Sequence, residues 1–280
     1  MSETLGKAGF WAVRLLPHLM LLIGLLAVWE WLVAAGVVTS ILIPRPSAIM
    51  ASIFRLYVTE GSIYEHFFIT LAEAVFGFLI GAGIAIALAV SSSLSDSFAR
   101  YVTPYAVVLN VTPGIALTPI IIAWFGYGMG SKIALAAVLC FFPIFVNTLT
   151  GLRQTDPDRE ELFRSFGASQ RQVFTQLRVP AALPLMFAGL KIGLTTALIG
   201  AVVAEFAQAT SGVGVLMARS SFSLDMASSL AALLSMTLIG LILFYSMELL
   251  DDRIVFWRRD ARMSAVSRAR AKAWADGAGK

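Results

Sequence analysis

The residue types that catalysis and metal binding require are scarce in this chain and widely separated. The single cysteine, Cys140, lies inside an apolar run, and the only two histidines, His18 and His66, lie far apart without a ligand pattern. The run SGVG contains a lone GxG, and the phosphate-binding pattern GxxxxGK followed by Ser or Thr does not occur. We therefore predict no metal site, no cofactor and no catalytic centre in this chain.

A charged segment between the fourth and fifth apolar runs, DPDREELFRSFGASQRQVFTQLRVPAALP, has the best-defined local pattern. Asp156 followed by Pro157 predicts a helix start, because the carboxylate can accept first-turn N–H groups and proline is tolerated at the first helical position. We expect this helix to run to Phe166 and to end where Gly167 adopts the left-handed conformation. Glu160 and Arg164 are spaced to pair on its polar face.

A second helix is predicted after the glycine. Ser169 and Gln172 have the spacing of a capping box, and Pro180 is expected to stop the helix. The predicted product is helix, Gly hinge, helix, with a narrow apolar stripe that must be covered by a membrane surface or by a protein groove. A groove is favoured because the charges are mixed rather than basic. The stripe comprises Leu162, Phe163, Phe166, Val173, Phe174 and Leu177.

The elements that carry this segment are membrane helices. The chain is 58% hydrophobic and 14% charged, which a soluble domain cannot accommodate on its surface. Six apolar runs are long enough to cross a bilayer as helices, so we predict an all-α integral membrane protein. The runs are 15–38, 67–91, 101–125, 133–152, 185–206 and 228–250, which divides the chain into a segment 1–14, a membrane domain 15–250 with its loop 153–184, and a basic tail 251–280.

Basic residues are distributed unevenly between the two sides of these spans. Of the 21 lysines and arginines, only Arg45, Arg55, Lys132 and Arg219 fall in the loops opposite the termini. The positive-inside rule therefore predicts that both termini and the charged segment are cytoplasmic. The net charge of +4 needs no nucleic-acid partner, and the tail is expected either to remain solvated or to touch anionic lipid.

Small residues recur at intervals of four in two of the runs, where they allow helices to approach closely. We expect them to serve helix packing rather than solute contact. They are Gly77, Gly81 and Ala85 in the second run, and Gly189, Gly193, Ala197 and Ala201 in the fifth, followed at the same interval by Glu205.

The third run contains three prolines, Pro104, Pro113 and Pro119, and must bend. Broken backbone at membrane depth occurs where it is buried in protein or lines a cavity, so the bend either borders a pathway or is satisfied by neighbouring helices. Mid-span threonines in the fifth run could face the same cavity or bond their own helix. The pathway candidates, none of them basic, are Asn110, Thr112, Pro113, Thr118, Thr195 and Thr196.

Three ionisable residues lie near the ends of spans. We expect Glu73 and Glu205 to lie toward the outer face, where they can be protonated, form a hydrogen bond or contact water, and Lys191 to reach the cytoplasmic interface by snorkelling. No acidic group is predicted at mid-bilayer, which argues against an ion-driven secondary transporter. An intramembrane enzyme is disfavoured by the lack of a nucleophile and base.

The charged segment resembles the EAA loop of ABC importer permeases, whose pattern is E-A-A, three residues, G, nine residues, I-x-L-P. Glu161, Gly167 and Pro180 match by identity and spacing, whereas Leu162 and Phe163 stand where that pattern has alanines. The stretches ILIPRPSAIM, ITLAEAVFGFLIGAGIAIALAV, TPIIIAWFGYGMGSKI, RVPAALPLMFAGLKIG and VVAEFAQATSGVGVL are similar to permeases of the nitrate, sulfonate and taurine importer group.

This resemblance implies the type I permease fold in a bacterial inner membrane. It implies a pair of permeases, two ATP-binding cassette subunits that use ATP and Mg, and an extracytoplasmic substrate-binding protein. It leaves the solute open among sulfonates, taurine, nitrate, vitamin precursors and aromatic acids. The coupling loop that it implies comprises Glu160, Glu161, Leu162, Phe163, Phe166, Gly167, Ala168, Phe174, Leu177 and Pro180.

Overall fold

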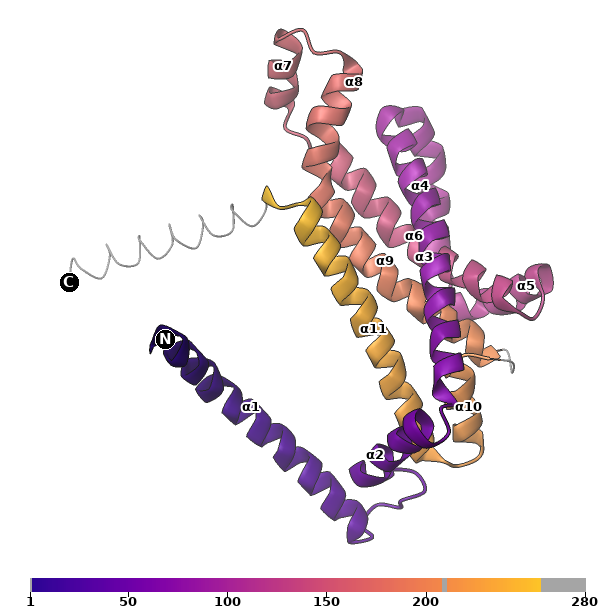
Figure 1. The fold of residues 1–280 in the computed structure, drawn as a ribbon. Helices are drawn as coiled ribbons and strands as arrows, with labels where there is room; N and C mark the ends of the chain where they lie inside the picture. The colour runs from indigo at the N-terminus through magenta and orange to yellow at the C-terminus, as the bar shows by residue number, and fades with distance from the viewer. Residues whose placement is uncertain (1, 208–210, 258–280) are drawn as a thin grey trace. The chain divides into compact units, whose positions relative to one another are not determined.

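The computed structural model describes residues 2–207 and 211–257, and every regular element among them is a helix (Figure 1). The basic tail predicted from residue 251 lies mostly outside these residues. The elements are α1 (Ser2–Ala34), α2 (Pro46–Phe54), the π-helix η1 (Arg55–Thr59), α3 (Ile63–Leu94), α4 (Asp96–Val111), α5 (Gly114–Phe125), α6 (Met129–Arg153), α7 (Pro157–Ser165), α8 (Gln170–Gln172), the π-helix η2 (Val173–Arg178), α9 (Val179–Ala207), α10 (Val213–Phe222) and α11 (Met226–Ile254).

Five helical stretches of the described residues are long and apolar enough to cross a membrane. They overlap the first, second, fourth, fifth and sixth predicted spans, which confirms the all-helical membrane fold. The sixth crossing exists only if α4 and α5 are counted together. The five stretches are Leu16–Ala34, Ile63–Leu94, Met129–Arg153, Gln170–Ala207 and Met226–Ile254.

The third predicted span is two helices rather than one kinked helix, because α4 and α5 are bent by 104°. The break lies at Thr112, whose φ of −73° and ψ of 123° are extended, and at Pro113, which caps the start of α5. A residue that precedes proline is disfavoured in the α-helical region, so the helix ends there. Pro104 and Pro119, by contrast, are accommodated inside α4 and α5.

Pro180 does not stop the second helix of the loop, contrary to the prediction. The helical stretch continues without interruption from Gln170 to Ala207. The reason lies in η2, where the backbone N–H of Val179 bonds the carbonyl of Phe174, five residues earlier. This wider turn makes room for the proline ring, which in a regular α-helix would clash with the preceding turn.

The chain divides into two compact units, Met1–Phe67 with Val213–Met236, and Phe68–Gly212 with Thr237–Lys280. In the first unit, α2 begins beside Glu30, whose carboxylate accepts the backbone N–H of Ser47 at 3.1 Å and its hydroxyl at 2.8 Å.

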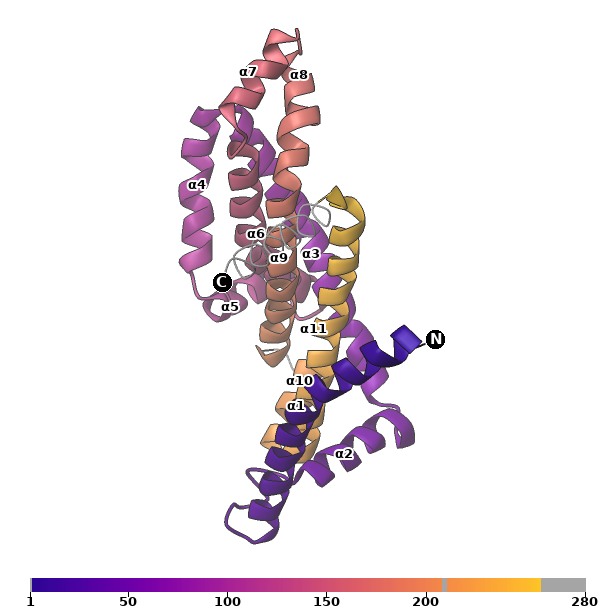
Figure 2. The ribbon, with the colours of Figure 1, turned by 90° about the vertical axis from the view of Figure 1, so that its left-hand side faces the viewer.

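In the second unit, α6 and α9 run side by side along most of their length (Figures 1 and 2). A Cβ on Gly189 would lie 2.9 Å from the carbonyl oxygen of Pro143, and one on Gly200 would lie 2.7 Å from Cα of Ala136. On α3, a Cβ on Gly81 would lie 2.5 Å from the carbonyl oxygen of Ala137. Backbones this close admit only glycine, so the packing role predicted for the small residues is confirmed. Ala85, Ala197 and Ala201 are fully buried with them.

Candidate coupling and translocation sites

The segment between α6 and α9 folds as a helical hairpin of α7 and α8, here called the α7–α8 hairpin (residues 156–178), at one end of these helices in Figure 2. Its first helix begins as predicted. The Asp156 carboxylate accepts the backbone N–H of Asp158 at 3.1 Å, and Pro157 occupies the first turn, where its missing N–H is not needed.

The turn of the hairpin is also as predicted. Gly167 has a φ of +80°, which is the left-handed conformation that glycine adopts without strain. Ser169 and Gln172 form both hydrogen bonds of the capping box, at 2.8 and 3.3 Å. Local side-chain chemistry therefore determines the shape of this segment.

The two halves of the hairpin are joined by an ion pair that the sequence pattern did not reveal. Nε and Nη2 of Arg178 donate to the two carboxylate oxygens of Glu160 at 2.6 and 2.8 Å. The predicted partner, Arg164, lies farther from Glu160, at 3.9 Å. The hydrogen bonds from Arg178 outweigh partial burial and hold the pKa of Glu160 below its ordinary value. Because the partners are 18 residues apart, only the folded turn brings them together.

The hairpin leaves apolar side chains exposed. The side chain of Phe166 is 82% exposed and that of Leu162 is 54% exposed, and the neighbouring carboxylate of Glu161 is exposed as well. The other members of the predicted stripe are half-buried, apart from Val173, which is buried. A shallow cavity of about 270 Å³ lies beside these side chains and is lined by Phe163, Phe166, Gly167, Ala168, Gln172 and Gln176.

Four of the predicted pathway residues lie at or near the break between α4 and α5. Asn110 and Pro113 are exposed, Thr112 is half-buried and Thr118 is buried. The hydroxyls of Thr112 and Thr118 donate to carbonyls four residues earlier in the chain, at 2.8 and 3.4 Å. Of these four, Asn110 therefore presents the exposed polar side chain.

The other two predicted pathway residues, Thr195 and Thr196, are half-buried on α9. Their hydroxyls donate to carbonyls three residues earlier in the same helix, at 2.8 and 2.9 Å. Local bonding of this kind was the alternative to a pathway role.

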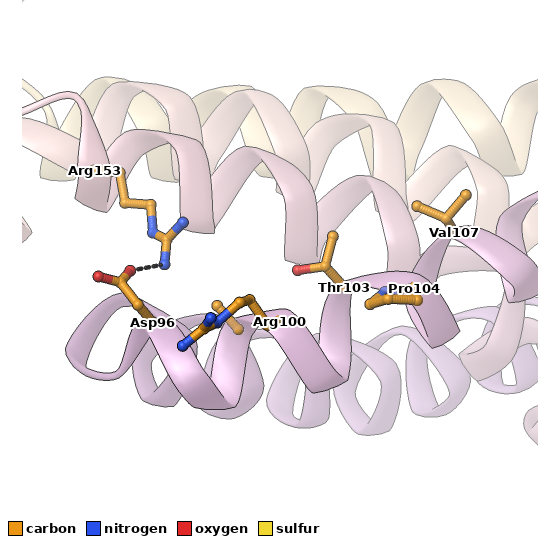
Figure 3. Close-up of a pocket in the computed structure, with 7 residues that line it drawn as sticks. Asp96, Arg100, Thr103, Pro104, Val107 and Arg153 are labelled. Carbon is orange, nitrogen blue, oxygen red and sulfur yellow. Dashed lines mark hydrogen bonds and ion pairs between the residues drawn. The ribbon is translucent and has the colours of Figure 1, made fainter.

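An open cavity of about 940 Å³ lies along α4, beside the end of α6 (Figure 3). Arg153 spans it, donating to Asp96 at 2.8 Å and to the carbonyl of Ser92 at 3.0 Å, and Arg100 points along the same wall (Figure 3). The sequence pattern missed this basic lining, because it considered only residues within the third and fifth runs. The complete lining is Asp96, Ala99, Arg100, Thr103, Pro104, Val107 and Arg153.

Of the alternatives predicted for Glu73 and Glu205, contact with water is wrong, because both are buried between helices of the second unit. Lys132 is buried with them and forms an ion pair with Glu73 at 2.9 Å. Its ammonium also donates to the carbonyl of Ser211 at 2.6 Å. The hydroxyl of Thr70 donates to Glu205 at 2.5 Å. We call the three charged residues the Glu73–Lys132–Glu205 cluster; the sequence pattern missed it because α3, α6 and α9 each supply one member.

Lys191 is paired with two carboxylates of the same unit, and its reach to the cytoplasmic interface stays a prediction. Its ammonium donates to Glu248 at 2.8 Å and to Asp251 at 2.7 Å, both on α11. These pairs tie α9 to α11 where both helices carry charged residues. Among the described residues, no group of three or more His, Cys, Asp or Glu side chains could hold a metal ion.

The chain is similar to several known membrane permeases. Over 87% of its length the chain is 31% identical to a probable ABC transporter permease of Haemophilus influenzae, covering 98% of that protein. It is 34% identical to the formylaminopyrimidine transport permease ThiX of Halalkalibacterium halodurans, over 84% of this chain and 93% of that one. It is 30% identical to a putative aliphatic sulfonates transport permease, SsuC, of Bacillus subtilis, over 84% of each.

The fold matches as well. A solved structure of the MetNI methionine ABC transporter in an inward-facing conformation superposes with a TM-score of 0.57 and 17% identity, covering 71% of this chain and 97% of that one. The model of the family described as "Binding-protein-dependent transport system inner membrane component" matches residues 77–256. The chain therefore belongs to this family of ABC importer permeases and has the type I importer permease fold.

Proposed function

We propose that this chain forms the solute pathway of an ATP-driven importer and performs no chemistry of its own. The names of its relatives point to small organic solutes: formylaminopyrimidine, aliphatic sulfonates and taurine. We infer a solute of this size, polar or anionic. ATP and Mg are used by separate partner subunits, and the description of a relative as an ABC transporter permease supports this division.

The working assembly that we propose contains two copies of this chain, two ATP-binding cassette subunits and a soluble substrate-binding protein on the outer side. The family description supports both the binding protein and an inner membrane location. Both termini and the α7–α8 hairpin lie in the cytoplasm, because the basic residues concentrate in the loops on that side.

The α7–α8 hairpin docks into a groove of the ATP-binding subunit. One observation carries this proposal. The hairpin, held in shape by its helix caps and its ion pair, exposes Phe166 and Leu162 outside the membrane-spanning stretches that contain α6 and α9. An aromatic side chain on a rigid turn loses little conformational freedom on binding and buries a large apolar area. The charged residues on either side of it are suited to the rim of such an interface.

Motion of the hairpin is transmitted through α9. The uninterrupted helix from Gln170 to Ala207 makes the second half of the hairpin the end of a transmembrane helix. A displacement of the docked tip therefore moves α9, and bending concentrates at Gly167 rather than at a second hinge near Pro180. The shift from inward to outward opening then repacks α9 against its neighbours.

The broken α4–α5 segment borders the pathway in this proposal. Interrupted helices line cavities in transporters, because the freed backbone groups need partners. The exposed amide of Asn110 is the main polar contact, and the half-buried or buried groups at the bend shape the wall. The pathway residues proposed are Asn110, Thr112, Pro113, Thr118, Thr195 and Thr196.

A stand-alone secondary transporter is the rival function, and a reconstitution separates the two. The chain is placed in proteoliposomes alone and together with its ATP-binding and substrate-binding partners. We expect uptake only with the partners and ATP. Uptake by the chain alone, driven by a proton or sodium gradient, would refute the proposal.

The docking step has its own test. Phe166→Ala should abolish the stimulation of ATPase activity by the substrate-binding protein while leaving the membrane level of the chain unchanged. Phe76→Ala, which removes another exposed aromatic ring, 52% exposed on α3 against 82% for Phe166, is the control and should retain stimulation. Equal stimulation in both variants would contradict docking at this tip.

A further inference from the structure

The open cavity along α4 has no part in the proposed coupling, yet its two ends differ in chemistry. Asp96, Arg100 and Arg153 lie at one end, and Val107 lies at the other, as Figure 3 shows. All of these residues belong to the second compact unit, so the cavity is built within one part of the chain. Its volume of about 940 Å³ is in the range of small-molecule sites.

The charges at the polar end of the cavity leave one guanidinium without a carboxylate. Arg153 donates to Asp96 at 2.8 Å, so the negative charge of Asp96 is already paired. Nη2 of Arg100 donates to the hydroxyl of Ser97 at 3.3 Å, and Arg100 forms no ion pair within the described part of the chain. The lining therefore carries one positive charge in excess, which favours an anion.

A second donor lies one helical turn after Arg100 on the same wall. Thr103 follows it by three residues, and both side chains line the cavity. The hydroxyl of Thr112 bonds a carbonyl four residues earlier in the chain, whereas the hydroxyl of Thr103 forms no hydrogen bond among the residues that the structure describes. A guanidinium and a neighbouring hydroxyl are donors suited to the oxygens of a sulfonate, carboxylate or phosphate group.

Arginines of the neighbouring hairpin provide a comparison. Arg159, Arg164 and Arg178 each form an ion pair with a carboxylate. Arg171 is exposed and, like Arg100, forms no ion pair within the described ranges, but it does not line the cavity. The feature that distinguishes Arg100 is therefore an uncompensated charge together with a hollow that can hold a ligand.

We propose that this cavity binds an organic anion, whose charged group accepts hydrogen bonds from Arg100 and Thr103 while its apolar part lies along Pro104 and Val107. Two kinds of molecule have this chemistry. One is a small solute such as an alkyl sulfonate, and the other is an acidic phospholipid, because basic pockets between membrane helices bind lipid phosphates. The site goes beyond the proposed transport function and does not depend on it.

Binding to the purified full-length chain tests the proposal, without any partner subunit. Hexanesulfonate, titrated by calorimetry in an uncharged detergent, probes the solute source. Phosphatidylglycerol, added to the same protein and counted by native mass spectrometry against phosphatidylcholine, probes the lipid source. We expect saturable binding of at least one of the two anions, and the anion that binds identifies the source. A chain that binds neither would overturn the proposal.

Substitutions in the cavity locate the site. Arg100→Gln should weaken binding about tenfold, because it removes the charge-assisted hydrogen bond, and Thr103→Val should weaken it about threefold. Both side chains are exposed, so neither substitution disturbs the packing of α4. Arg171→Gln removes the same charge outside the cavity and is the matched control, which should bind like the wild type. Equal weakening by Arg100→Gln and Arg171→Gln, or none by Arg100→Gln, would overturn the site.

Discussion

The guanidinium of Arg178 donates two hydrogen bonds to the carboxylate of Glu160, from Nε at 2.6 Å and from Nη2 at 2.8 Å. The pair connects α7 to the last residue of η2, immediately before α9 begins. A bidentate pair fixes orientation as well as distance. The first turn of α7 is therefore linked to the start of the transmembrane helix through side chains, whereas the second half of the hairpin is linked to it through the backbone.

Arg178→Lys should loosen this link. A lysine ammonium cannot reproduce the planar fork, and at this partly exposed position we expect a loss of about 1 kcal/mol, or roughly a fivefold increase in opening. Hydrogen exchange of the backbone amides of α7 measures the opening. Arg164→Lys, at a residue 3.9 Å from Glu160, is the control and should leave exchange unchanged. Equal effects of the two substitutions would argue against the bidentate link.

The same link should fail in acid. The pKa of Glu160 is lowered in the folded hairpin from its ordinary value of 4.5, so the ionised form is favoured by folding. The ion pair of Glu160 therefore contributes its full stability to the hairpin above pH 4.5. That stability is lost as the pH falls through the lower pKa of the folded state. Exchange rates of α7, corrected for their intrinsic pH dependence, should rise below that pH in the wild type. In Glu160→Gln they should be already raised at neutral pH and should show no such step.

Gly167 should tolerate alanine far better than proline. A Cβ at this position meets no atom within 4 Å, so alanine suffers only the strain of a positive φ, about 1–2 kcal/mol. Proline fixes φ near −65° and cannot adopt +80°, so the turn cannot form. We expect Gly167→Pro to insert in the membrane and to abolish stimulated ATPase activity, whereas Gly167→Ala retains part of it.

Glu161→Lys should give the same coupling defect for another reason. The exposed carboxylate lies beside Leu162 at the proposed docking surface. Reversing its charge removes the electrostatic complementarity between the hairpin and the groove of its partner. ATPase stimulation and membrane level are the two measurements. Stimulation at the wild-type level in both Glu161→Lys and Gly167→Pro would count decisively against coupling at the α7–α8 hairpin.

Two glycines of α3 should respond oppositely to alanine. At Gly81 a Cβ would lie 2.5 Å from the carbonyl oxygen of Ala137, whereas at Gly83 it would meet no atom within 4 Å. Gly81→Ala should lower the stability by about 1–3 kcal/mol, because α3 and α6 must separate. Gly83→Ala should be neutral or stabilising by up to about 1 kcal/mol. Thermal unfolding in detergent distinguishes the two, and equal destabilisation by Gly83→Ala would show that the close contact between α3 and α6 is not the cause.

The sequence by itself determined the features that depend on neighbours along the chain. The length of apolar runs specified the membrane helices, because a bilayer of fixed thickness requires a fixed number of apolar residues. Asp156, Gly167, Ser169 and Gln172 specified the hairpin, because caps and turns are formed by residues two or three positions apart. The repeated small residues specified where helices pack, although their partners could not be named.

Only the tertiary structure decided which distant side chains meet and whether a local signal prevails. Pro180 predicts the end of a helix, but the wide π-helical turn of η2 lets the helix continue past the proline. Glu160 forms its closest ion pair with Arg178, 18 residues away, in addition to the predicted pair with Arg164, and Glu73 pairs with Lys132. Pairings of this kind depend on the distance and burial that helix packing creates, and residues far apart along the chain carry no periodic signal of them.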